Sequence, residues 1–136
     1  MKIINKVFAV LIMLLVLSTS MMSCHRSTVD EQCAEMIKRE KRRLPRNIAR
    51  GVVLDSMKYE THKKTVVFYY TLCDSLFSDE SIAQGRSQME SQLLDEIANS
   101  VALRRLKDNG VSFKYVYLGD AKQERLVLNF ENKYLH

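Results

Sequence analysis

The stretch that most constrains the fold is a ten-residue run that is apolar on both faces, Lys64 to Cys73 (KTVVFYYTLC). Its β-branched and aromatic residues favour a strand. Because side chains alternate along a strand, one face carries Val66, Phe68, Tyr70 and Leu72, and the other carries Val67, Tyr69, Thr71 and Cys73. We expect helices to cover the first face of this central strand. The second face is then an apolar surface open to a partner.

Neighbouring segments supply the other strands of a predicted sheet. Gly51 to Tyr59 is rich in β-formers and is expected to form a hairpin with the central strand through polar residues 60–63. A second hairpin is predicted near the carboxyl end, with alternation from Val111 to Tyr117, a turn at Gly119 to Gln123, and a return strand from Leu126 to Phe130. The expected sheet therefore has four antiparallel strands.

Two helical patterns precede these hairpins. Thr28 with Glu31 forms a capping box before an apolar stripe that runs to Leu44, where Pro45 ends the helix. A longer helix is predicted from about Ser81, with its regular part after Gly85, a break at residues 99–100 and an end at residues 109–110. The order α-β-β-α-β-β predicts an α+β fold with the helices packed on one face of the sheet.

The amino-terminal segment reads as an export signal. Lys2 and Lys6 precede 11 unbroken apolar residues, Val7 to Leu17, and small polar residues follow. A membrane-spanning helix needs about 20 apolar residues, so this run is too short for a comfortable permanent anchor. We therefore expect residues 1–23 to be removed.

Cys24 follows Met21, Met22 and Ser23, and this segment resembles the lipobox of bacterial lipoproteins, in particular the relaxed boxes ending in Ser-Cys of Bacteroidetes-type lipoproteins. The resemblance implies that the Cys24 thiol receives a diacylglycerol, that the new amino terminus is acylated with a fatty acid such as palmitate, and that the protein is held at the cell envelope, on the outer membrane. Several acyl chains would anchor it firmly, because each buried methylene contributes about 0.8 kcal/mol. The alternative is a plain signal peptide, cut between Ser18 and Ser23, that leaves Cys24 as a free thiol.

Removal of residues 1–23 leaves 113 of the 136 residues, which suits one domain. We expect a short tether over 24–27, a single α+β domain over 28–131 and a polar tail over 132–136. Without Lys2 and Lys6 the formal net charge falls from +5 to +3, which is too mild to indicate a nucleic-acid partner. The segments LDSMKYE, VVFYYTL and VSFKYVYLGD resemble core patterns in small exported α+β domains of bacterial lipoproteins of uncharacterised function. That resemblance attaches no catalytic positions.

A basic run on the first predicted helix has two readings. Its members are Lys38, Arg39, Lys41, Arg42 and Arg43. On a lipid-tethered domain they could contact anionic head groups. The interleaved Glu40 favours an ordinary solvated helix face instead.

The sequence shows no pattern that indicates catalysis or metal binding. The candidate carboxylates Asp74, Asp79, Glu80, Asp95 and Glu96 lie in no motif, and His25, His62 and His136 are dispersed. We assign no catalytic residue, no metal site and no cofactor. Cys33 and Cys73 could form a disulfide in an oxidising envelope. The strand alternation argues against that bridge, since it places Cys73 on the face away from the helices.

These observations favour a non-enzymatic binding or structural module of the envelope. Tyr69, Val116 and Leu118 are expected on the open sheet face, where they could bind a protein partner or a second copy of the chain. The alternative is an enzyme or small-molecule binder with a pocket between sheet and helices. That alternative predicts converging carboxylates or a histidine in the pocket.

Overall fold

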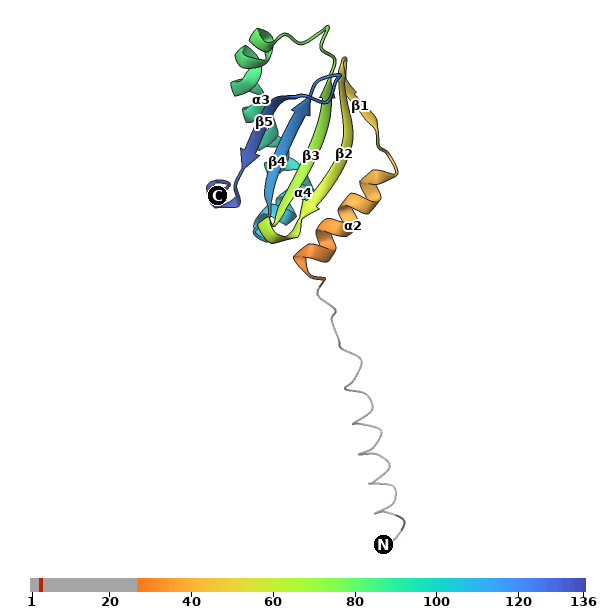
Figure 1. Cartoon of the computed structure of the whole chain (residues 1–136). Helices are drawn as coiled ribbons and strands as arrows, with labels where there is room; N and C mark the ends of the chain where they lie inside the picture. Colours follow the sequence, from red (N-terminus) through yellow and green to blue (C-terminus); the bar gives the residue numbers. More distant parts are fainter. Residues whose placement is uncertain (1–2, 4–26) are drawn as a thin grey trace.

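Five strands form one sheet in the order β1-β2-β3-β4-β5. The computed structural model describes Ile3 and residues 27–136, so the leader and Cys24 lie outside the described residues. Along the chain the elements are α2 (Val29–Lys41), β1 (Arg46–Ala49), β2 (Val52–Glu60), η1 (Thr61–Lys63), β3 (Thr65–Leu72), α3 (Asp79–Asn99), α4 (Val101–Asp108), β4 (Ser112–Leu118), β5 (Glu124–Phe130) and η2 (Asn132–Tyr134) (Figure 1).

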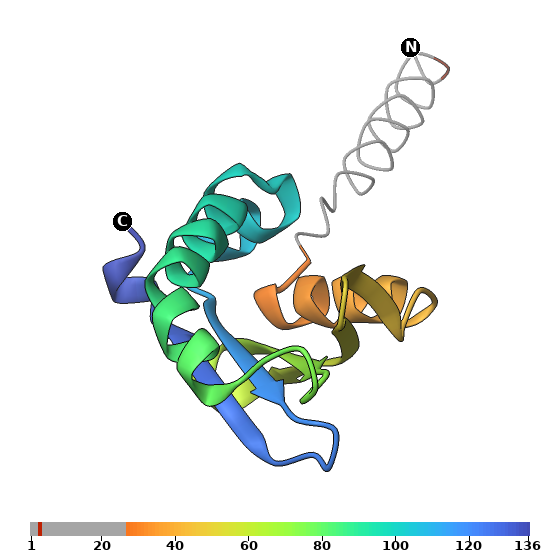
Figure 2. The same cartoon turned by 90° about the horizontal axis from the view of Figure 1, so that it is seen from above.

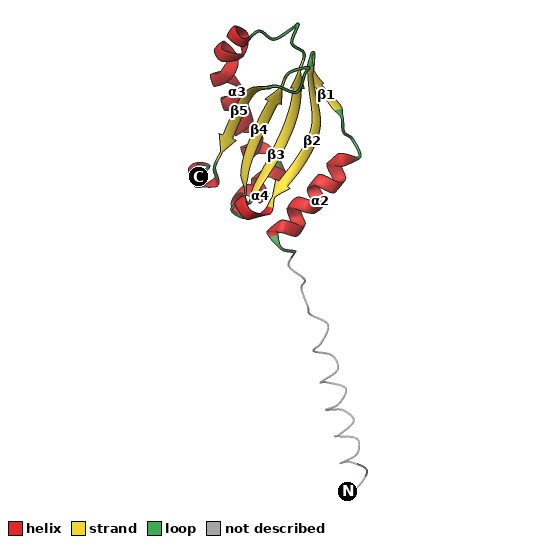
Figure 3. Ribbon diagram, in the orientation of Figure 1, coloured by secondary structure: helices red, strands yellow, loops and turns green. Residues whose placement is uncertain are grey.

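The α+β class and both hairpins are confirmed, and the four-stranded antiparallel sheet is corrected. β2 pairs antiparallel with β3, and β4 pairs antiparallel with β5, as predicted. The central pair, β3 and β4, is parallel, because α3 and α4 form a crossover that returns the chain beside β3 in the same direction (Figure 3). The predicted antiparallel sheet contains no such crossover.

The fifth strand, β1, was not predicted. It has four residues, all exposed, and pairs antiparallel with β2 at the edge of the sheet. A strand that buries no side chain shows no alternation of apolar and polar residues, so no pattern indicates it. Pro45, just before β1, indicated only the end of a helix.

The predicted helix caps are largely confirmed. The Thr28 amide donates to Glu31 Oε2 at 3.0 Å, and the Glu31 amide donates to Thr28 Oγ1 at 3.2 Å. Ser100 separates the last two helices and caps α4, accepting from the Leu103 amide at 3.4 Å. Gly110 follows with a φ of +88°, the left-handed conformation expected after α4. The prediction that regular helix begins only after Gly85 is wrong, because α3 is continuous from Asp79.

All three long helices cover the same face of the sheet (Figure 2). The core joins buried residues of these helices to one alternating set on each inner strand; among its members are Cys33, Ile97, Leu106, Val66, Phe68, Phe113, Tyr115 and Leu128. Val67 and Val116 are also buried but stand outside this core, because they belong to the opposite face. The prediction that helices cover only one face is therefore confirmed.

The segment predicted as a polar tail forms a last turn, η2, against the fold. The Asn132 side-chain amide donates to the carbonyl oxygens of Lys107 at 2.6 Å and Val111 at 3.0 Å. The Asn132 main-chain amide donates to Ser112 Oγ at 2.9 Å. One asparagine thus ties the carboxyl end to the junction of α4 and β4.

Candidate functional site

A groove crosses the helix-covered face of the sheet, and we call it the helix-face groove. α2 packs on β2, whereas α3 packs on β5, so the two helices stand over different parts of the sheet (Figure 2). The strip between them forms a cavity of about 510 Å³. β1, the sheet floor and α3 supply its lining: Ile48, Ala49, Arg50, Val52, Tyr70, Leu72, Phe77, Ser81, Ile82, Gly85, Gln88, Met89, Gln92, Leu93, Glu96 and Tyr117.

A second cavity of about 280 Å³ continues the groove toward α2 and α4. Ile48, Tyr70 and Glu96 line both cavities, so they mark the junction. The second cavity is walled on one side by Met36 of α2 and on the other by the first turn of α4. Together the two cavities make one groove between α2 with β1 and α3 with α4.

The two walls of the groove are formed by different elements, a continuous helix and an edge strand. The α3 wall follows from helical spacing, because Ser81, Gly85, Gln88, Gln92 and Glu96 recur every three or four residues and face the same way. The β1 wall is an edge strand held by β2, and its Ile48 is 48% exposed. An exposed isoleucine beside an apolar groove is a feature of a binding surface more than of a closed core.

Gly85 leaves a gap in the α3 wall. A glycine inside a helix costs about 1 kcal/mol relative to alanine. A Cβ built at Gly85 would meet no atom within 4 Å, so packing within the described residues does not require a glycine there. The missing side chain lets another chain approach the α3 backbone closely.

A row of stacked aromatic rings lies on the sheet under the groove, and Phe68, Tyr70 and Tyr117 of this row line its floor. Tyr70 and Tyr117 stack across the parallel strands with ring centroids 4.8 Å apart, and Phe68 and Tyr115 stack in the same way at 4.7 Å. Tyr70 and Tyr115 link the two pairs at 6.3 Å. Burial raises the pKa of Tyr117 to about 12 and raises the pKa values of Tyr70 and Tyr115 as well, so all three phenols are neutral at ordinary pH.

Glu96 is the acidic residue of α3 that reaches this floor. Desolvation raises the pKa of its carboxyl group, and the positive charge of Arg46 partly offsets that rise. Arg46 itself pairs with Glu40 across 3.6 Å. Glu40 and Glu96 therefore share one cavity with a cation near both, and the cavity holds no histidine.

The other candidate carboxylates lie away from the groove. Asp74 and Asp79 both accept hydrogen bonds from Arg125 of β5, beside the connection between β3 and α3. Glu80 and Asp95 are exposed on α3. His62 lies in η1 and His136 at the carboxyl end. Two of the carboxylates that the enzyme alternative predicts, Glu40 and Glu96, do line the second cavity, so that alternative stays a prediction.

The structure brings together the three residues expected on the open sheet face. Tyr69 of β3 lies opposite Val116 of β4 in the register, and Thr71 lies opposite Leu118. Val116 is buried, whereas Tyr69 and Leu118 are partly exposed. In the described part of the chain, no helix covers this face.

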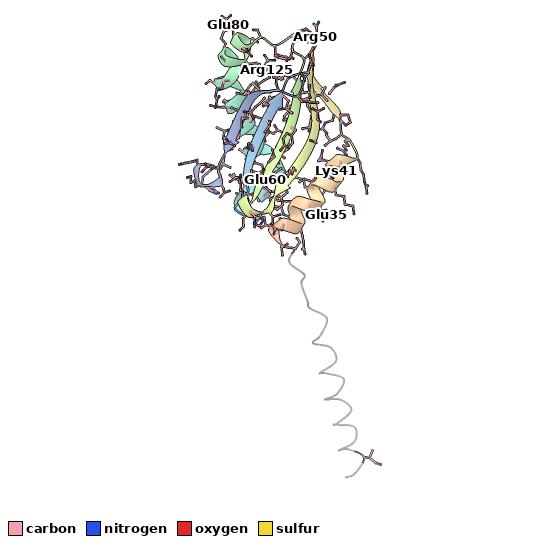
Figure 4. All side chains as sticks on the ribbon, in the orientation of Figure 1. Glu35, Lys41, Arg50, Glu60, Glu80 and Arg125 are labelled. Atoms are coloured by element: carbon pink, nitrogen blue, oxygen red, sulfur yellow. The ribbon has the colours of Figure 1, made fainter. Side chains whose placement is uncertain are left out.

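Cys33 and Cys73 are free thiols at opposite ends of the β2–β3 hairpin, so the bridge left open above is not formed. Cys33 lies by Tyr59, and Cys73 lies by Gly51. Figure 4 labels Glu60, which follows Tyr59 at the end of β2, and Arg50, which precedes Gly51 just before β2 begins. Gly51 and Tyr59 are eight positions apart along the strand, which is about 26 Å at about 3.3 Å per residue, so the two cysteines beside them lie far apart. A disulfide needs Cα atoms within about 7 Å.

The sequence predicted a pocket between sheet and helices only as the alternative, and Glu96 was the one lining residue considered as a candidate for chemistry. Gly85 carried a signal, since an interior helix glycine needs a reason, but it was interpreted as a weak first turn. Cys24, the predicted lipidation site, lies outside the described residues. None of the described helices combines the length and hydrophobicity needed to cross a bilayer.

The sheet and helices define an α+β arrangement shared with three solved structures. A Pseudomonas aeruginosa protein described as a "putative secreted protein" matches with a TM-score of 0.63 at 16% identity, over 82% of this chain and 99% of that one. The pilotin EpsS of the Vibrio vulnificus type 2 secretion system matches with 0.62 at 9% identity, over 79% and 92%. The type II secretion pilotin AspS of Vibrio cholerae matches with 0.57 at 12% identity, over 77% and 90%.

At these identities the likeness establishes the fold alone. Residues 28–127 match the model of a family described as a domain of unknown function, DUF8479, and the chain belongs to that family. The comparison with curated protein sequences finds no match.

Proposed function

We propose that this protein is a membrane-tethered module of the bacterial envelope that holds a helical segment of a protein partner in the helix-face groove. The observation that carries the proposal is the groove itself, whose apolar floor lies between an edge strand and an unpartnered helix face. A second supporting observation is the fold, which is shared with two pilotins of type II secretion systems. We infer a comparable accessory role in an envelope assembly.

The dimensions and lining of the groove favour an amphipathic helix as the occupant. The α3 wall runs from Ser81 to Glu96, which is about 22 Å at 1.5 Å per residue and matches a segment of about four helical turns. The α3 wall has apolar residues, Ile82, Met89 and Leu93, and polar residues, such as Gln88 and Gln92, that can form hydrogen bonds. The gap at Gly85 gives a second helix room to lie close to α3. Recognition of amphipathic helices in apolar grooves is a recurring binding mode.

The proposed tether is the lipid on Cys24. The described domain begins only a few residues later, with α2 starting at Val29, so lipidation would keep the groove near the membrane surface. The substitution Cys24→Ser is expected to release the protein from the membrane fraction, and mass spectrometry of the wild-type protein should find acyl chains on Cys24. Retention of Cys24→Ser in that fraction would contradict the tether.

The groove is tested by site-specific photocrosslinking in intact cells. A photoreactive residue at Gln88 or Gln92 is expected to capture the same partner peptide, drawn from a segment with one apolar helical face. Gly85→Trp should abolish the capture by filling the gap. Ala83→Trp is the matched control, because Ala83 is exposed on α3 and does not line the groove.

The open sheet face is a second candidate surface, since helices leave it uncovered and Tyr69, Val116 and Leu118 lie together on it. Photoreactive residues at Tyr69 and Leu118 test it in the same cells. Capture from these two positions, with none from Gln88 or Gln92, would assign binding to the sheet face and contradict the groove.

A further inference from the structure

The junction of the two cavities gathers polar groups that the fold does not pair. In the described part of the chain, the ion pairs within 4.0 Å include Arg46 with Glu40 but none with Glu96, and no hydrogen bond reaches the Glu96 carboxylate. Beneath the groove, the buried hydroxyl of Tyr115 also has no hydrogen-bond partner, although Tyr115 lines neither cavity. Tyr70 and Tyr117 stand in the same aromatic row and line the groove beside Glu96.

The side chains of Tyr70 and Tyr117 are buried, and a buried hydroxyl without a partner is costly, because it loses hydrogen bonds to water and gains none in return. Burial is the main cause of the raised pKa values of the three phenols, and the negative charge of Glu96 adds to each rise, so these groups lie within electrostatic reach of Glu96. Glu96 remains open to solvent at the groove mouth. A ligand that enters the groove can therefore reach it.

The chemistry of these groups selects a cationic donor. A carboxylate only accepts hydrogen bonds, and a phenol oxygen can accept one as well. A guanidinium or ammonium group supplies several N–H donors together with the positive charge that compensates Glu96. An acidic ligand would be repelled by the carboxylate, and a purely apolar one would leave the same groups unpaired.

We propose that Glu96, with the hydroxyls of Tyr70 and Tyr117, forms a subsite for an Arg or Lys side chain on the segment that the helix-face groove holds. The inference rests on the proposed function, because it names the chemistry of that segment. The charge of Arg46 reaches Glu96, but its ion pair within 4.0 Å is with Glu40, at 3.6 Å, so Arg46 does not bind the Glu96 carboxylate directly. The subsite lies where the two cavities meet, so it fixes the position of the segment along the groove.

The subsite is tested without the partner by NMR titration with n-butylguanidinium, which mimics an arginine side chain, and with pentanamide as a neutral probe of similar length. We expect saturable shifts at Glu96, Tyr70 and Tyr117 with n-butylguanidinium and weaker binding of pentanamide. Glu96→Gln should weaken n-butylguanidinium binding about tenfold by removing the charged acceptor. Asp95→Asn is the matched control, because it makes the same change at the preceding exposed residue of α3.

Equal binding of the two probes, or unchanged binding of n-butylguanidinium to Glu96→Gln, overturns the subsite. Circular dichroism of Glu96→Gln checks that this variant is folded. Tyr117→Phe removes a second group of the subsite and should also weaken n-butylguanidinium binding. If a photoreactive residue at Gln88 captures a partner peptide but n-butylguanidinium binding does not depend on Glu96, the proposed function stands and the subsite is overturned. Glu96-dependent binding without capture supports a cation site and overturns the proposed function.

Discussion

The hydroxyl of Tyr59, near the end of β2, donates to Asp30 Oδ1 in the first turn of α2 at 2.6 Å. The two residues lie 29 positions apart, and the contact fixes the start of α2 to the sheet. Cys33 is buried one helical turn further on, against the same tyrosine. The helix nearest the predicted tether is therefore bound to the sheet by a polar contact at its start and by core packing just after it.

Tyr59→Phe is expected to lower the free energy of unfolding by about 1 kcal/mol, because it removes a hydrogen bond to a charged group at a solvent-accessible site. Asp30→Asn and the double variant complete a thermodynamic cycle, measured by urea denaturation. Strictly additive losses in the double variant would show that the two side chains do not interact.

Gly85→Ala is expected to raise the free energy of unfolding by up to about 1 kcal/mol, since alanine favours the helix and its Cβ meets no atom. Gly51→Ala is the contrasting variant. Gly51 has a φ of +75°, and a Cβ there would lie 2.7 Å from Leu76 Cδ1, so this variant should lose stability. Thermal unfolding of both variants measures the difference. A destabilised Gly85→Ala would contradict the gap in the α3 wall.

The hydrogen bonds and charges around Asp74 predict that the free energy of unfolding falls at acidic pH. Hydrogen bonding from Gln123, then the Asp120 amide and the charge of Arg125, lowers the pKa of Asp74 below its ordinary value of 3.8. A depressed carboxyl pKa stabilises the fold above that ordinary value, and the contribution is lost as the pH falls through the folded-state pKa. The stability difference between wild type and Asp74→Asn should therefore narrow below about pH 3.8. A difference that stays constant from pH 7 to pH 2 would contradict this role.

The buried thiol of Cys33 predicts that the free energy of unfolding falls at alkaline pH. Burial, reinforced by the charge of Asp30, raises the pKa of the Cys33 thiol from 9.0 to about 11. The folded state then holds a proton that the unfolded state releases, so this contribution to stability is present below pH 9 and is lost as the pH rises to about 11. Cys33→Ala should show a weaker loss over that interval in urea denaturation at stepped pH.

The same burial predicts selective alkylation. At neutral pH the native protein should react at Cys73, which is partly exposed, and not at Cys33, which is fully buried. Unfolding should expose both thiols to the reagent. Mass spectrometry of the alkylated peptides reads out the result, and rapid labelling of native Cys33 would contradict its place in the core.

Sequence patterns predicted the parts of this fold that bury side chains at regular intervals. The alternation of Val66, Phe68 and Tyr70 located β3 and the face that the helices cover, and Thr28 with Glu31 located the start of α2. The patterns could not supply β1, which buries nothing. They also could not supply the direction of β4, because a strand reads alike in either sense, and only the α3–α4 crossover decides it.

The site was harder to predict than the fold, for a physical reason. Tyr70, Tyr117 and Glu96 come from three separate elements, and each has an ordinary structural role in its own segment. Their meeting depends on how α3 packs over β3 and β4, and no local pattern encodes that packing. The open sheet face, by contrast, could be predicted, since alternation alone places Tyr69 and Val116 on it.

β1 has a consequence for the range of segments that the groove can hold. The strand is four residues long and irregularly paired, with a register shift between Asn47 and Ala49, and it buries no side chain. Displacing it outward would break main-chain hydrogen bonds at one edge while every core contact stayed in place. The groove thus combines a rigid side on α3 with a side that can yield, so its width can adapt to bulkier or slimmer segments at little cost in stability.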